Sequence, residues 1–146
     1  MIELEKTYLA KKLPKNLKNY KFKEIIDIYI PKSNDHPKLR LRKNGNKFEI
    51  TKKEPVQPVD NKDISRQKEQ TIILTEIEFN ALNKLEGKRI HKIRYYFDYN
   101  GQIAEFDIFQ DSLKGLVIVD FEFKTIKEKE NFQMPNFCLT DIVVVF

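Results

Sequence analysis

The chain has 146 residues, 40% of them hydrophobic, and its 27 basic and 22 acidic side chains leave a formal net charge of +5. This length and composition are typical of one folded domain and exclude an intrinsically disordered chain. The single cysteine, Cys138, excludes an intramolecular disulfide and a cysteine-based zinc site. His36 and His91 lie far apart, which argues against a histidine metal centre or a Ser/His/Asp triad. The N-terminus does not resemble a signal peptide and no apolar run approaches a membrane span, so we expect a cytoplasmic protein.

The first half of the chain carries strand and turn signals. Ile2 and Leu4 alternate with glutamates, which is typical of a strand whose two faces differ. The pair Asn44-Gly45 between two alternating segments predicts a β-hairpin. The lysine-rich stretch 10–23 is expected to be a loop or a poor helix. Strands are predicted over 2–9, 24–30, 38–42 and 47–53, the second ended by Pro31.

The second half continues this pattern after an expected exposed, mobile loop over 54–66. Thr75 and Glu78 form a capping-box sequence that opens a helix through Leu85, and Gly87 is a suitable helix stop. A second short helix is predicted over 126–132, and Asn100-Gly101 predicts another hairpin turn. Strands are predicted over 69–74, 89–99, 102–110, 116–124 and 142–146. Eight or so short strands with two minor helices favour a mainly β fold, an antiparallel sheet or barrel.

The most informative feature is a set of like-charged pairs at positions i and i+2, separated by apolar residues. A period of two places each pair on one face of its strand. An antiparallel sheet with one solvated face would produce any single pair. Within each strand, however, the pairs have one sign, and like charges repel unless an opposite charge lies between them. The pairs are Glu3/Glu5, Arg40/Arg42, Lys92/Arg94, Glu105/Asp107 and Asp120/Glu122. If these faces line the inside of a barrel, a polyanion with Mg²⁺ or Mn²⁺ would supply the missing opposite charges.

These residues stand in the order of a known family. The segment Ile2-Glu3-Leu4-Glu5-Lys6 resembles the E-x-E-x-K signature of the CYTH domain, which tripolyphosphatases, thiamine triphosphatases and class IV adenylate cyclases share. The resemblance covers nearly the whole chain and continues through 39–42, 51–53, 65–67, 92–95, 101–109, 119–123 and 135–142. It implies one CYTH-like domain over 1–146, folded as an eight-stranded, closed or nearly closed antiparallel β-barrel with a few short flanking helices.

The resemblance also implies roles for individual residues. Phosphates would be bound by Arg40, Arg42, Lys53, Lys92 and Arg94. The metal, Mg²⁺ or Mn²⁺, would be bound by Glu3, Glu5, Glu69, Glu105, Asp120 and Glu122. The catalytic residues would be Glu5, Lys92 and Arg94. Lys53 is preferred to Lys52 as the phosphate ligand because it shares a face of the strand with Thr51. For Asp107 the alternative to a metal-binding role is a structural role as a hydrogen-bonding residue.

The chain also departs from the family pattern. Position 7, where the signature has lysine, is Thr7, and the neighbouring Lys6 falls on the opposite face unless a bulge re-aims it. Thr71 replaces a second acidic residue, and Leu139 and Asp141 replace the glycine and glutamate of the closing motif. The sequence therefore predicts a divergent member of the family.

Several functions remain open at this point. The first is metal-dependent hydrolysis of tripolyphosphate or an organic triphosphate, and a related one is class IV adenylate cyclase chemistry. A second is a catalytically weak or inactive module that binds polyphosphate or nucleotide, which the threonines at 7 and 71 favour. A third, a nucleic-acid-binding barrel, is opposed by the acidic pairs, which would repel a phosphate chain. We expect a triphosphate as the partner and neither nucleic acid nor membrane, and a homodimer stays open.

Overall fold

The computed structural model describes residues 2–56 and 67–144, with the side chains of Ile2 and Glu3 outside the description. Most of the loop expected over 54–66 therefore lies outside the described residues. Within the described part, ten strands form one sheet with the order β1-β6-β5-β4-β3-β7-β8-β9-β2-β10. The strands are β1 (Ile2–Glu3), β2 (Glu5–Ala10), β3 (Phe22–Ile30), β4 (Leu39–Asn44), β5 (Lys47–Pro55), β6 (Gln67–Leu74), β7 (Lys88–Tyr99), β8 (Gln102–Phe109), β9 (Val117–Glu122) and β10 (Cys138–Asp141). Two α-helices, α1 (Glu76–Leu82) and α2 (Ile126–Asn131), and the 3₁₀ turns Leu17–Asn19 and Asp111–Leu113 connect them.

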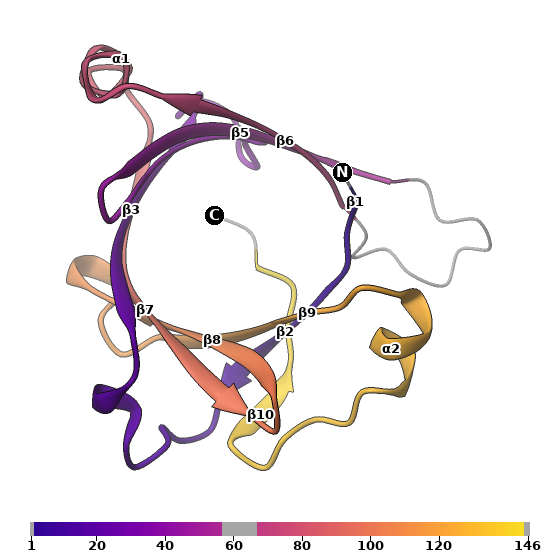
Figure 1. Ribbon diagram of the computed structural model, residues 1–146. Coiled ribbons are helices and arrows are strands. Elements are labelled where there is room, and N and C mark those ends of the chain that lie inside the picture. Colours follow the sequence, from indigo (N-terminus) through magenta and orange to yellow (C-terminus); the bar gives the residue numbers. More distant parts are fainter. Residues whose placement is uncertain (1, 57–66, 145–146) are drawn as a thin grey trace.

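The sheet curves until the N-terminal segment touches both of its sides. β1 pairs with β6 and β2 pairs with β9, and all strand pairs are antiparallel. Viewed end on, the strands follow a ring, with α1 and α2 outside it (Figure 1). The predicted mainly β, antiparallel fold with short helices is confirmed. The count of eight strands is wrong, and the order runs from β1 to β10 with an interruption at Leu4 instead of forming a continuous closed ladder.

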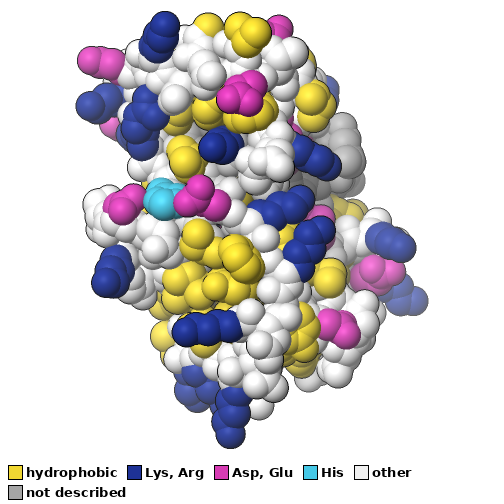
Figure 2. Space-filling model, turned by 60° about the vertical axis from the view of Figure 1, so that its left-hand side comes forward, with side chains coloured by type: hydrophobic (Ala, Val, Ile, Leu, Met, Phe, Trp, Pro, Cys, Tyr) yellow, Lys and Arg dark blue, Asp and Glu magenta, His cyan; other side chains and the backbone are white. Residues whose placement is uncertain are grey.

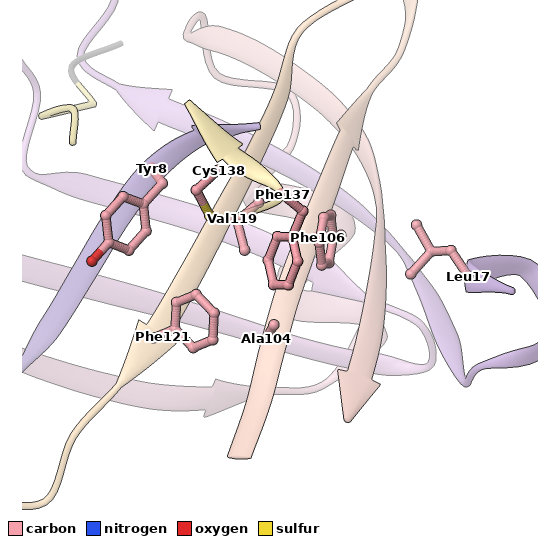
Figure 3. Packing of buried hydrophobic residues seen from close by; sticks show 8 residues of the cluster. All are labelled: Tyr8, Leu17, Ala104, Phe106, Val119, Phe121, Phe137 and Cys138. Atoms are coloured by element: carbon pink, nitrogen blue, oxygen red, sulfur yellow. The ribbon is translucent and has the colours of Figure 1, made fainter. Parts of the chain in front are cut away.

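The hydrophobic core lies largely on the outer side of the curved sheet. Tyr8, Phe106 and Phe121 point outward from β2, β8 and β9, and Phe137 from the segment before β10 packs on them (Figure 3). The Phe137 ring lies 5.3 Å from that of Phe106, and such aromatic contacts add about 0.5–1.5 kcal/mol each beyond the area they bury. A second cluster joins Ile28, Leu41 and Phe79 beneath α1. Because the apolar side chains of these strands pack on the outer side of the sheet, the side chains at the alternate positions face inward.

The predicted local signals are largely confirmed. The Thr75 hydroxyl accepts a hydrogen bond from the Glu78 amide, and the Glu78 carboxylate accepts one from the Thr75 amide, which completes the capping box. The second hairpin turns at Asn100-Gly101 with φ values of 51° and 83°. The first turns one residue later than predicted, at Gly45-Asn46, because Asn44 still pairs with Lys47.

Two predictions fail. The last strand was predicted over 142–146, but residues 142–144 form no strand and 145–146 lie outside the described residues; Cys138–Asp141 instead forms β10 on the edge of β2 (Figure 1). Gly87 is not the helix stop, because α1 already ends at Leu82. Instead Gly87 lies against β3, where a Cβ would come within 2.5 Å of Ile28 Cγ2. None of the helices in the described part of the chain has both the length and the hydropathy to cross a membrane.

Candidate functional site

A cavity of about 830 Å³ runs along the inward face of the sheet. Period-two alternation brings the predicted charged side chains to its wall from β2 and from β4 through β9. The lining includes the predicted residues Glu5, Arg40, Arg42, Lys53, Glu69, Lys92, Arg94, Glu105, Asp120 and Glu122. Glu3 stands in β1, but its side chain lies outside the description. Lys52, predicted to point away, is half exposed and forms an ion pair with Glu54 at 3.3 Å.

Arg42 is held by a carboxylate that the sequence did not single out. Its Nε and Nη2 donate to the two carboxylate oxygens of Asp27 at 2.6 and 2.7 Å. The two residues stand directly opposite each other on β4 and β3, and both side chains are buried. Burial acts to raise the pKa of Asp27, but the charge and hydrogen bonds of Arg42 outweigh it and lower that pKa. The guanidinium is thereby fixed at the wall by two of its five N–H groups.

Asp107 likewise holds two more of the residues that were predicted to bind phosphate. Arg94 donates to both of its oxygens at 2.6 and 2.8 Å, and Lys92 Nζ lies 2.9 Å from Oδ2. Burial acts to raise the pKa of Asp107, but the charges of Lys92 and Arg94 dominate and lower it to about 2. The position of Asp107 is that of a structural hydrogen-bonding residue, the alternative given to it from the sequence. Glu105 lies further from Arg94, at 3.7 Å.

Arg40 is the predicted phosphate ligand with an unsatisfied buried donor. Its side chain lines the cavity with 8% of the residue exposed, and its Nε has no hydrogen-bond partner among the described residues. A buried N–H without an acceptor costs about 1–3 kcal/mol. An anion in the cavity could supply that acceptor. Lys53, on the adjacent strand β5, lies 3.6 Å from Glu69.

The wall formed by β2 and β9 is acidic. Glu5 stands opposite Glu122, and Thr7 stands opposite Asp120. The Thr7 hydroxyl donates a 2.5 Å hydrogen bond to Asp120. Burial, together with the charge of Asp107, raises the pKa of Asp120 to about 6. A nearby cation stabilises the ionised form of a carboxyl whose pKa is raised, so this wall favours a positively charged ligand.

The departures from the family pattern have local explanations. Thr7 faces the cavity as its position predicts, and its hydroxyl is engaged by Asp120. Thr71 forms a 2.9 Å hydrogen bond with Thr51, which lies directly opposite on β5, and its hydroxyl donates to Glu69 at 3.3 Å. Lys6 also lines the cavity, although parity predicted the opposite face. No bulge re-aims it, because Lys6 pairs with Phe121 in the regular register in which Glu5 and Thr7 pair with Glu122 and Asp120.

Two further residues escaped the sequence reading, one that holds a residue of the cavity wall from behind and one that lines the wall. Asp27 lies in an apolar strand. The sequence feature that could have indicated its role is that it is the lone acidic residue in an isoleucine-rich run. Lys129, in α2, is buried and lines the cavity from outside the sheet. It lies in a polar run of the sequence that gives no sign of burial. Outside the cavity, Lys and Arg side chains are scattered among acidic and hydrophobic ones on the face shown in Figure 2.

The acidic wall suits a hard divalent cation in the chemistry of its donors. Carboxylate oxygens are the ligands that Mg²⁺ and Mn²⁺ prefer. Among the described residues, no three His, Cys, Asp or Glu side chains stand close enough together to hold a metal by themselves. Mg²⁺ commonly uses one or two carboxylates and completes its coordination with water and substrate phosphates. The donor set fits an ion that arrives with a phosphate ligand.

Comparison with known proteins identifies a relative by sequence but no family model. No family model matches the chain. The inorganic triphosphatase of Nitrosomonas europaea is 31% identical over 109 residues, which cover 73% of this chain and 68% of that protein.

Solved structures share the fold. A crystal structure of an inorganic triphosphatase matches with a TM-score of 0.64 and 23% identity, over 95% of this chain and 85% of the other. A protein from Pyrococcus horikoshii matches with a TM-score of 0.56 and 16% identity over 88% and 83% of the two chains. A Hippeastrum protein with a dominant triphosphatase activity matches with a TM-score of 0.53 and 13% identity over 88% and 82%. On the sequence relative and this shared fold, the chain belongs to the CYTH, or triphosphate tunnel, family.

Proposed function

We propose that this chain hydrolyses a phosphoanhydride bond of tripolyphosphate, or of an organic triphosphate, held in the cavity of the curved sheet with Mg²⁺ or Mn²⁺. The family membership and the inorganic triphosphatase relative support the reaction. We also propose that residues 1–146 act as one domain, that the curved sheet works as a tunnel, and that the protein is cytoplasmic.

The observation that carries the proposal is the state of the cavity's arginines. Arg40 has a buried Nε with no partner among the described residues, and it points to a missing acceptor. Arg42 and Arg94 are each fixed by a buried aspartate through two N–H groups. Each guanidinium has five N–H groups, so both keep donors for a phosphate while Asp27 and Asp107 hold their orientation. Preorganised donors of this kind stabilise charge that develops during phosphoryl transfer.

In the proposed reaction, water attacks the terminal phosphorus and the bridging P–O bond breaks, so that its oxygen leaves with the diphosphate. No protein nucleophile is needed. Arg94 and Lys92 would neutralise charge on the transferred phosphoryl group, and Arg40, Arg42 and Lys53 would bind the remaining phosphates. Glu5 would accept a hydrogen bond from the attacking water. When bound, the divalent ion would neutralise phosphate oxygens and lower the pKa of coordinated water, with Glu5, Asp120 and Glu122 as its nearest wall ligands and Glu3, Glu69 and Glu105 as further candidates.

A second candidate is a module that binds a triphosphate without cleaving it. The observation in its favour is Thr7, whose hydroxyl is engaged by Asp120 and which brings no positive charge to the acidic wall. Binding through the arginines would survive this loss, whereas hydrolysis needs the attacking water and the phosphoryl group to be positioned together.

Phosphate release from tripolyphosphate, pyrophosphate, ATP and thiamine triphosphate, with Mg²⁺ or Mn²⁺, separates the two candidates. We expect release from at least one triphosphate. Arg40→Met should raise KM about tenfold or more, the effect of a lost charge-assisted hydrogen bond. It should leave stability unchanged or higher, because the Nε had no partner to lose. Arg89→Met, outside the cavity, is the matched control. Tight binding of a triphosphate without release would refute hydrolysis and leave the binding module.

A further inference from the structure

A second pocket, of about 550 Å³, lies outside the cavity and has a basic lining. The connection between α1 and β7 forms most of it, and Lys32, shortly after β3, completes it. Gly87 lets this connection lie close to β3, because a Cβ there would come within 2.8 Å of the Tyr29 carbonyl oxygen. The pocket is thus built on the end of the strand whose Tyr29 lines the cavity. Its charged residues are Lys32, Lys84, Lys88, Arg89 and Glu86.

The lysines of this pocket have no acidic partner among the described residues. Lys32 and Lys84 are exposed, and their side chains form no hydrogen bond or ion pair within that part of the chain. Lys88 Nζ donates to the backbone oxygen of Asp35 at 2.7 Å, a neutral acceptor that orients the ammonium and leaves its charge uncompensated. Arg89 is bound by Asn83 through two N–H groups, so the lysines are the cations open to a ligand.

The pocket adjoins one end of the cavity. Residues 31–38, here called the mouth loop, connect β3 to β4 and therefore lie at an end of the ring of strands. His36 and Lys38 of this loop line the cavity, whereas Lys32 lines the pocket. Lys88 connects the two sides, because it lines the pocket and its Nζ donates to the backbone of the mouth loop. A phosphate chain that leaves the cavity over this loop therefore meets the lysines of the pocket.

Positive charge outweighs negative charge along this route. The acidic side chains are those of Asp35 in the mouth loop and Glu86 in the pocket, and both are exposed. The basic ones are those of Lys32, Lys38, Lys84 and Lys88. A phosphate chain carries negative charge at every unit, so cations spread along a route can each bind a different unit. This distribution suits a linear polyanion better than a compact anion.

We propose that Lys32, Lys84 and Lys88 bind the continuation of a linear inorganic polyphosphate whose end lies in the cavity. The protein thus takes polyphosphates longer than tripolyphosphate and holds them by the end of the chain. This inference rests on the proposed function, which puts a phosphate chain in the cavity. The continuity of pocket and cavity favours this occupant, because a single linear chain can engage both.

The test compares the double variant Lys32→Met/Lys84→Met with Lys18→Met/Lys127→Met, which removes the same charge from exposed lysines outside both linings. Calorimetric titration, with and without Mg²⁺, uses tripolyphosphate and a size-fractionated linear polyphosphate several times longer. The pocket variant should bind the long chain at least about threefold more weakly, the effect of two lost exposed ion pairs, and should bind tripolyphosphate normally. The control variant should bind both ligands as the unmodified protein does.

An unchanged affinity of the pocket variant for the long chain would overturn the inference. An equal loss in the control variant would also overturn it, because the effect would then come from net charge alone. Should the pocket variant fail to fold, acetylation of the unmodified protein, read by mass spectrometry, provides the answer. The long chain should slow acetylation of Lys32 and Lys84, and tripolyphosphate should not. Equal acetylation of these lysines with either ligand overturns the inference.

Competition distinguishes this inference from the proposed function and from other polyanions. Excess tripolyphosphate should displace the long chain, because both occupy the cavity. A long chain that stays bound would show that the pocket binds polyanions on its own, nucleic acid included, and would overturn the inference. Binding of both ligands without phosphate release refutes the proposed reaction, while the pocket is still judged by its variants. Normal phosphate release from tripolyphosphate, with equal binding of the long chain by the pocket variant and the unmodified protein, overturns this inference alone.

Discussion

Replacing Asp107 by asparagine should remove the counter-charge of two buried cations and destabilise the protein strongly. Asp107 is 1% exposed and contacts Lys92 and Arg94. Its pKa is about 2 in the folded protein against a reference value of 3.8. At about 1.4 kcal/mol per pKa unit, this difference corresponds to about 2 kcal/mol of stability at neutral pH. Removing one partner of a buried ion pair costs about 3–5 kcal/mol, which the nearby Glu105 and Asp27 should reduce. We expect Asp107→Asn to lower the free energy of unfolding by about 2–4 kcal/mol.

Urea unfolding at pH 7 and at intervals from pH 5 to pH 2 tests this expectation. Because the folded pKa of Asp107 is below the unfolded value, its stabilisation is present above about pH 4 and is lost as the pH falls toward 2. The variant should therefore lose less stability over this interval than the unmodified protein. Tripolyphosphate should restore part of the loss by supplying negative charge. Asp35→Asn, at an exposed side chain, should change stability by less than about 0.5 kcal/mol. Equal stability of Asp107→Asn and the unmodified protein at pH 7 would refute the electrostatic reasoning.

Three further changes test separate features. Thr7→Lys should lower the pKa of Asp120 below its value of about 6 and, if position 7 limits turnover, raise the rate of phosphate release; an unchanged rate would show that it does not. Gly87→Ala should cost about 1–3 kcal/mol in urea unfolding, because the new Cβ would meet Ile28 at 2.5 Å, and full stability would contradict this contact. Thr75→Ala should cost about 1 kcal/mol by removing the helix cap, with no effect on tripolyphosphate binding, and an unaltered unfolding midpoint would count against the cap.

The inward face was predictable from the sequence because strand alternation and turn chemistry are local. Asn100-Gly101 fixes its hairpin, and the turn sets the register in which Arg94 meets Asp107. The ion pair between Arg42 and Asp27 was not predicted, because β3 and β4 are joined by a connection whose length does not fix their register. Asp27 became recognisable as a partner only once the two strands were aligned.

The misjudged elements depend on distant contacts. Ile142, Val143 and Val144 have a high strand propensity, yet Cys138–Asp141 is the segment that pairs with the edge of β2. Gly87 was read as a local helix signal, whereas its contact is with a strand nearly sixty positions earlier in the chain. The burial of Lys129 likewise accompanies long-range packing near α2, where the Phe132 ring lies 4.6 Å from that of Phe121, and the polar residues next to it in the sequence do not indicate it.

The aspartates that hold the cavity arginines also decide which anions can compete for them. Asp27 and Asp107 are permanently attached at high local concentration, so chloride or a single phosphate must displace or share a neighbour that is already in place. A chain of linked phosphates engages several cations at once, and each contact after the first is intramolecular. The built-in carboxylates should thus favour a connected series of negative charges over chloride or a single phosphate.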